Sequence, residues 1–156
     1  MKNVKIPEVI YSILLQKAND ERKNLEDVIV DLLISSLNGD KSRLYTQLSR
    51  EYLQLATKLE KEGKLSESGE AYWKSLSYIL RKIGSELKMD IENYHDYFSL
   101  IEYLSYRTDN KELIVDFLNS EKLHGEFHPR SQNVEEFKIR VNHLKNLLNI
   151  LENINI

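Results

Sequence analysis

Only 5 Gly and 2 Pro are spread through the 156 residues, and this scarcity of chain-breaking residues most constrains the fold. Because Gly and Pro mark most turns and strand ends, a chain with so few of them is expected to form long helices. Apolar residues also recur at every third or fourth position, as in Leu44, Leu48, Tyr52, Leu55 and Leu59. That spacing places them along one side of a helix. The sequence therefore predicts an all-α protein.

Two breaks divide the predicted helices. Asn38-Gly39-Asp40 has the composition of a linker and separates residues 1–38 from residues 41–156. Gly63 suits the left-handed position that ends a helix, and the short loop around it makes the next helix return antiparallel. We expect residues 41–156 to form a bundle of helices.

Later helix starts are predicted from side chains that accept hydrogen bonds from the first turn. Asp109 and Glu112 have capping-box spacing before the fourth helix of the bundle, and Asn133 and Glu136 have it before the fifth. The fourth helix is expected to run to about His128, because a proline follows and disfavours helical geometry there.

Residues 1–38 are expected to form a unit of their own. Residues 3–7 alternate polar and apolar, which suits a short strand, and Pro7 can open a helix. Asn24 then offers an N-cap for a second helix. This order resembles a ribbon-helix-helix unit, in which two chains pair their strands antiparallel.

In DNA-binding ribbon-helix-helix proteins the outward strand residues read the major groove, and here these would be Lys2, Asn3 and Lys5. Charge opposes that role, because residues 1–38 contain five Lys or Arg and six Asp or Glu, and the whole chain has a net charge of -3. Phosphate contacts supply much of the affinity for DNA. The alternative is a dimerisation segment or a helical hairpin packed on the main domain, and the protein is expected to be a homodimer.

Several classes of protein are excluded by composition. The chain has no Cys, so disulfides and thiolate chemistry are absent. Pro7, Glu8, Lys17 and Asp20 break the first apolar run, unlike a signal peptide, and no stretch approaches the ~18 apolar residues of a membrane span. No Gly-rich phosphate loop or nucleophile elbow is present. We expect a cytoplasmic protein with no membrane segment and no cofactor.

Three short segments carry a family resemblance over about residues 44–151. They are Leu59-Glu60-Lys61-Glu62-Gly63-Lys64-Leu65, Tyr72-Trp73-Lys74 and Lys122-Leu123-His124-Gly125-Glu126-Phe127. With them the chain resembles the archaeal PaREP family and the HEPN helical domains (higher eukaryotes and prokaryotes nucleotide-binding). The resemblance implies that residues 41–156 form an up-and-down bundle of four to five helices, commonly dimeric. Many HEPN domains are ribonucleases with a groove between two protomers.

The HEPN nuclease motif consists of an Arg, then four to six intervening residues, then a His. The resemblance puts His124 on the motif His, as general acid or base. The Arg would fall at Phe117, Leu118 or Asn119, and none of these is basic. The chain therefore departs from the nuclease pattern, and an Arg would have to come from elsewhere in the fold or across the dimer: Arg81, Arg107 or Arg130.

His124 also belongs to a weaker metal-site hypothesis. On a continuous helix His124 and His128 lie four residues apart on one face, with Glu121 one turn earlier. Imidazole nitrogen and carboxylate oxygen suit zinc or iron. The simpler interpretation is a packed His124, and His143, opposite the apolar stripe of its helix, is expected to be solvated or packed beneath a neighbour.

The leading hypothesis from the sequence is a non-enzymatic, dimeric HEPN-like protein that binds a macromolecular partner, either a protein or a nucleic acid or nucleotide. The missing Arg and the acidic balance motivate it. The alternatives are a degenerate, toxin-like ribonuclease that needs no metal and a transcription regulator that reads DNA through its N-terminal strand.

Overall fold

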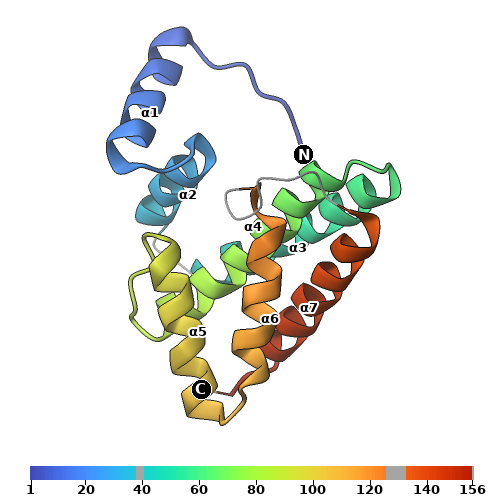
Figure 1. Ribbon diagram of the computed structural model, residues 1–156. Helices are drawn as coiled ribbons and strands as arrows, with labels where there is room; N and C mark the ends of the chain where they lie inside the picture. Colours follow the sequence, from blue (N-terminus) through green and yellow to red (C-terminus); the bar gives the residue numbers. More distant parts are fainter. Residues whose placement is uncertain (38–40, 126–132, 156) are drawn as a thin grey trace. The chain divides into compact units, whose positions relative to one another are not determined.

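The computed structural model describes residues 1–37, 41–125 and 133–155 (Figure 1). Within these ranges the regular structure is helical and contains no strand, so the prediction of an all-α protein is confirmed. There are seven α-helices and one short 3-10 helix among the described residues. The chain divides into two compact units, Met1–Lys41 and Ser42–Ile156, and the predicted linker at residues 38–40 lies outside the described residues.

The first unit contains α1 (Glu8–Glu21) and α2 (Leu25–Ser36). Arg22 adopts the left-handed conformation, with φ of 53°, and ends α1. Asn24 begins α2, because its side chain accepts a hydrogen bond from the N–H of Asp27 at 2.9 Å. The N-cap predicted at Asn24 is confirmed.

The short strand predicted over residues 3–7 is not seen, so this part of the predicted strand-helix-helix segment is wrong. Residues 1–7 form neither helix nor strand. A strand exists through pairing of its N–H and C=O groups with a neighbouring strand. No other described segment of this chain is a strand that could pair with it. Alternating polar and apolar residues are therefore not sufficient here.

The second unit begins with an antiparallel hairpin of α3 (Lys41–Lys61) and α4 (Leu65–Glu86). Gly63, in the loop between them, has φ of +75°, as predicted for the end of a helix. The N–H of Lys64 donates to the carbonyl of Leu59 at 3.0 Å and closes the turn.

Small polar side chains line the contact between α3 and α4. The hydroxyls of Ser49 and Ser75 are hydrogen-bonded at 3.0 Å, and the Ser68 hydroxyl donates to the carbonyl of Ala56 at 2.8 Å. Small residues let two helices approach closely, and each buried hydroxyl has a partner, which removes the cost of burying it.

The remaining elements are α5 (Tyr94–Thr108), α6 (Glu112–Ser120), the 3-10 helix η1 (Glu121–Leu123) and α7 (Val134–Glu152). Helices α6 and α7 lie alongside each other (Figure 1). The core of the unit is centred on α4, whose inner face is almost fully buried. Fully buried large side chains of the core are Tyr72, Leu76, Leu80, Leu100, Ile101, Leu104, Leu113, Phe117, Leu123, Phe137, Leu144 and Leu147.

The two predicted capping boxes have different outcomes. Asp109 is not the N-cap of α6; it ends α5 in the left-handed conformation, with φ of 50°. Asp tolerates this conformation better than most residues do. Asn133 does cap α7, because its side chain accepts from the N–H groups of Glu135 and Glu136.

None of the helices in the described part of the chain combines the length and the apolar character needed to cross a membrane.

Candidate functional site

The stretch that contains His124 is not the end of a long helix. The fourth bundle helix, predicted to reach about His128, ends as α6 at Ser120 and continues as η1. His124 itself has extended backbone, with φ of -82° and ψ of 128°. His124 therefore does not present its side chain as part of a continuous helical face, and His128 lies outside the described residues.

Tight packing against α4 explains why the chain turns there. Leu123 is buried, and its carbonyl oxygen lies where a side chain on Gly69 would be: a Cβ at Gly69 would be only 2.7 Å from it. The absence of a side chain at Gly69 lets η1 lie directly on α4. The local sequence of η1 does not contain this information.

His124 is held by two residues of α4. Its Nδ1 lies 2.7 Å from Oε2 of Glu70, and the N–H of Gly125 donates to Oε1 of the same carboxylate at 2.5 Å. The imidazole ring stacks on Trp73, with ring centroids 5.6 Å apart and an angle of 7° between the planes. About a quarter of the His124 side chain is exposed (25%).

A carboxylate at one imidazole nitrogen can fix the tautomer or stabilise the protonated ring. The Glu70–His124 pair can therefore hold a proton at the edge of the domain. The sequence did not point to Glu70, because it lies 54 residues before His124 and on another helix. Of the α4 residues that contact His124, the sequence pointed only to Trp73, as part of the segment Tyr72-Trp73-Lys74 that carries the family resemblance.

The two described arginines suggested as partners for His124, Arg81 and Arg107, lie beside tyrosines. The Arg81 Nε donates to the Tyr97 hydroxyl at 2.9 Å, and its guanidinium lies 5.8 Å from the centroid of the Tyr78 ring. Arg107 lines a surface groove with Tyr106, and Arg130 is outside the described residues. These positions of Arg81 and Arg107 among the described residues do not include a contact with His124.

The metal-site hypothesis has no support within the described ranges, where no group of three or more His, Asp or Glu side chains could hold an ion. Glu121, one of its predicted ligands, is buried, with 6% of the residue exposed. Its Oε2 has no hydrogen-bond partner among the described residues, and Oε1 lies 3.5 Å from the Lys122 amine. Burial raises the pKa of the Glu121 carboxyl above its usual range, and Lys122 opposes this only in part.

Glu121→Gln is expected to stabilise the protein at neutral and higher pH by about 1 kcal/mol, because burying an ionised carboxyl with one unpartnered oxygen is costly. The folded state holds the Glu121 proton more tightly than the unfolded state does. The wild-type protein therefore loses stability as pH rises through the raised pKa. Urea unfolding at several pH values measures this, with the exposed Glu135→Gln as control. If the difference in free energy of unfolding between wild type and Glu121→Gln did not vary with pH, the raised pKa of Glu121 would be wrong.

A second constellation, which the sequence interpretation missed, joins α6 and α7. Nδ1 of His143 lies 2.7 Å from Oδ1 of Asp116, and the side-chain amide of Asn146 donates to Oδ2 at 2.6 Å. Asp116 is 3% exposed. His143 lies off the main apolar stripe of α7, as expected, but it packs over a buried carboxylate rather than being simply solvated.

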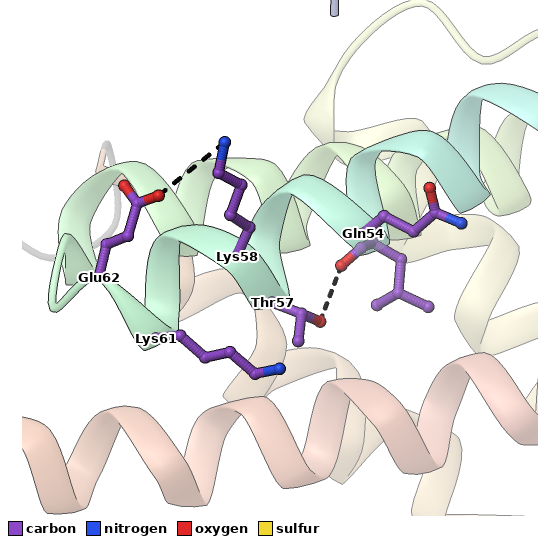
Figure 2. A pocket seen from close by; sticks show the side chains of 6 residues that line it. Gln54, Thr57, Lys58, Lys61 and Glu62 are labelled. Atoms are coloured by element: carbon purple, nitrogen blue, oxygen red, sulfur yellow. Dashed lines mark hydrogen bonds and ion pairs between the residues drawn. The ribbon is translucent and has the colours of Figure 1, made fainter.

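Two surface features complete the description. Lys2, Asn3 and Lys5 are exposed within residues 1–7, and no described contact brings them into a site. On α3 a shallow groove of about 630 Å³ is lined by six residues, among them Leu53, Thr57 and Lys61. Figure 2 shows Lys58 reaching towards Glu62, whereas the Lys61 side chain extends away from Glu62.

Comparison with known families identifies the second unit. The profile of the archaeal PaREP1/PaREP8 family matches residues 44–148, which is more than half of the chain. The chain belongs to this family. The PaREP1/PaREP8 region spans Glu70, Trp73, Asp116, His124 and His143, whereas the first unit lies outside it.

The predicted PaREP resemblance is confirmed. Comparison with curated proteins and with solved structures gives no match for this PaREP1/PaREP8 chain.

Proposed function

We propose that the protein is a non-enzymatic homodimer with an HEPN-like helical bundle that binds a macromolecular partner, and that residues 1–38 form the dimer contact. The observation that carries this proposal is the number of exposed apolar side chains in the first unit. These are Met1, Val4, Ile6, Val9, Ile10, Tyr11, Ile13, Leu15, Ile29, Leu32, Leu33 and Leu37.

The described part of the second unit, which is much larger, exposes only six large apolar side chains. The first unit buries just Ala18, Val28, Val30 and Ile34 in return. Two helices of this length with so small a core are marginal on their own. Burying a large apolar side chain contributes about 1.5–3 kcal/mol of favourable free energy. An interface that buries several of these exposed side chains therefore gains several times that free energy.

A second copy of the chain is the simplest cover for this surface. In a dimer with two-fold symmetry the same patch meets itself, so an apolar face on one protomer finds an apolar face on the other. The twelve exposed side chains come from residues 1–37 and include both helices of the unit. Exposed apolar surface beyond a few scattered residues typically marks a protein contact.

Ile13→Glu is expected to convert the protein from a dimer to a monomer, because Ile13 is 63% exposed on α1 and would bring an unpaired carboxylate into the apolar contact. Light scattering coupled to gel filtration measures the mass, which should fall from twice 18.4 kDa to 18.4 kDa. Ser12→Glu adds the same charge at the neighbouring exposed position. As the control, it should leave the protein a dimer. A wild-type protein that runs as an 18.4 kDa monomer would refute the dimer.

Partner binding by the second unit is supported by a surface groove of about 750 Å³ at the end of α5. Tyr106, which is 86% exposed, lines it together with Arg107 and Lys111. Glu102 and Asp109 line the groove as well, so its charges are of both signs. An exposed Tyr beside an Arg is typical of surfaces that contact other macromolecules. Tyr78 and Tyr97 are buried, whereas Tyr106 is exposed.

One specific observation favours the ribonuclease alternative: the Glu70 carboxylate at Nδ1 of His124. A carboxylate-oriented imidazole is a suitable general acid or base. RNA cleavage by purified protein that is lost in His124→Ala would favour this alternative, whereas cleavage that persists would be a contaminant. Affinity for duplex DNA that falls on Lys5→Ala would instead favour a transcription regulator.

A further inference from the structure

A groove on the outer side of α6 and α7 surrounds the His143–Asp116 pair and has a volume of about 490 Å³. Helix α6 contributes Glu112, Val115 and Asp116 to it. Helix α7 contributes Ile139, Asn142 and His143, with Asn146 beside them. The groove belongs neither to the His124 region nor to the first unit, so it is independent of the proposed dimer.

The buried carboxylate of Asp116 determines how His143 is presented. An ionised carboxylate only accepts hydrogen bonds, so Nδ1 of His143 is the donor at 2.7 Å. The second oxygen of Asp116 is already used, because the Asn146 amide donates to it at 2.6 Å. Asp116 therefore lines the groove and holds the imidazole ring, but both of its carboxylate oxygens already accept hydrogen bonds.

The other edge of the imidazole is available to a ligand. His143 lines the groove and 33% of its side chain is exposed. Among the described residues Nε2 has no hydrogen-bond partner. With the proton on Nδ1, the neutral ring presents the lone pair of Nε2, which accepts a hydrogen bond.

The charge of the groove selects the kind of ligand. Glu112 adds an exposed carboxylate and Asp116 contributes a second acidic group. Among the described residues, no Lys or Arg lines the groove. Acceptors and negative charge favour a cationic hydrogen-bond donor over an anion such as phosphate. Val115 and Ile139, which are 52% and 55% exposed, provide apolar surface for a hydrocarbon stem.

We propose that this groove binds an ammonium or guanidinium group on a short apolar stem, with Nε2 of His143 and the Glu112 carboxylate as acceptors. Val115 and Ile139 contact the stem. A free organic cation and a Lys or Arg side chain of a polypeptide share this chemistry. The groove is large enough for either, and the two sources are distinguished by the test.

The test follows the imidazole resonance of His143 and the side-chain amide of Asn146 by NMR in the full chain. The probes are n-butylguanidinium, the capped peptide acetyl-Gly-Arg-Gly-amide, and butan-1-ol as a stem without charge. Both cations are expected to give saturable shifts, and butan-1-ol is not. Glu112→Gln should weaken cation binding about tenfold, because the charge-assisted hydrogen bond is lost. Glu135→Gln, on α7 but outside the groove, should leave the affinity for both cations unchanged.

Tighter binding of the peptide than of n-butylguanidinium would support the proposal with a polypeptide as the source, and equal or weaker binding would support a free cation. Three results would overturn it: no saturable shift up to roughly 50 mM, well above a millimolar affinity; equal shifts with butan-1-ol; or unchanged binding by Glu112→Gln. Because Glu112 is exposed, that variant is expected to fold normally.

Discussion

Phe117→Ala is expected to lower the free energy of unfolding by about 4 kcal/mol, in the range measured when buried Phe is truncated to Ala. Phe117 is fully buried, and its ring lies against three other aromatic rings, with centroid distances of 5.9 Å to Trp73, 6.1 Å to Tyr94 and 6.1 Å to Phe98. Removing it leaves a cavity beneath the Trp73 ring on which His124 stacks.

Guanidinium unfolding followed by Trp73 fluorescence measures this loss, since Trp73 is the only tryptophan of the chain. Leu118→Ala is the matched control, because Leu118 is the next residue of α6 and is 42% exposed. It should cost much less. Equal losses in the two variants would contradict the position of Phe117 in the core.

Gly69→Ala is expected to destabilise the second unit by about 2 kcal/mol, as over-packing of a core does. An Ala in the interior of a helix normally stabilises it by roughly 1 kcal/mol relative to Gly. A loss of stability in Gly69→Ala would therefore indicate the close contact with η1. The added Cβ would be 2.7 Å from the Leu123 carbonyl oxygen and 3.6 Å from the Phe137 ring. Because the first of these is a backbone atom, η1 must move.

The same variant should also disturb the stacking of His124 on Trp73, which NMR shifts of the His124 ring report. Ser66→Ala, an exposed substitution one turn earlier on α4, is the control and should change stability by less than about 0.5 kcal/mol. If Gly69→Ala instead stabilised the protein, the close packing of η1 on α4 would be wrong.

Some local signals in the sequence predicted local structure correctly, whereas the cap predicted at Asp109 was wrong. Gly63 ends its helix turn with positive φ, and Asn24 and Asn133 cap their helices through their own side chains. Each of these features depends on a few neighbouring residues. The strand at residues 3–7 failed because pairing needs a second segment.

The candidate sites depend on contacts between distant parts of the chain, which periodicity does not contain. The turn before His124 is imposed by Gly69 on another helix, and its ring is held by Glu70. His143 was set aside because it lies off the apolar stripe of α7, and its partner Asp116 lies 27 residues earlier on α6.

The most direct test of the proposed assembly is energy transfer between first units of different copies. The chain has no Cys, so Ser12→Cys gives one labelling site on α1. Donor-labelled and acceptor-labelled protein are mixed at increasing concentration. The account predicts transfer that rises with concentration and disappears when Ile13→Glu is added to the labelled chain. No transfer at any concentration, together with a sedimentation mass of 18.4 kDa, would contradict it.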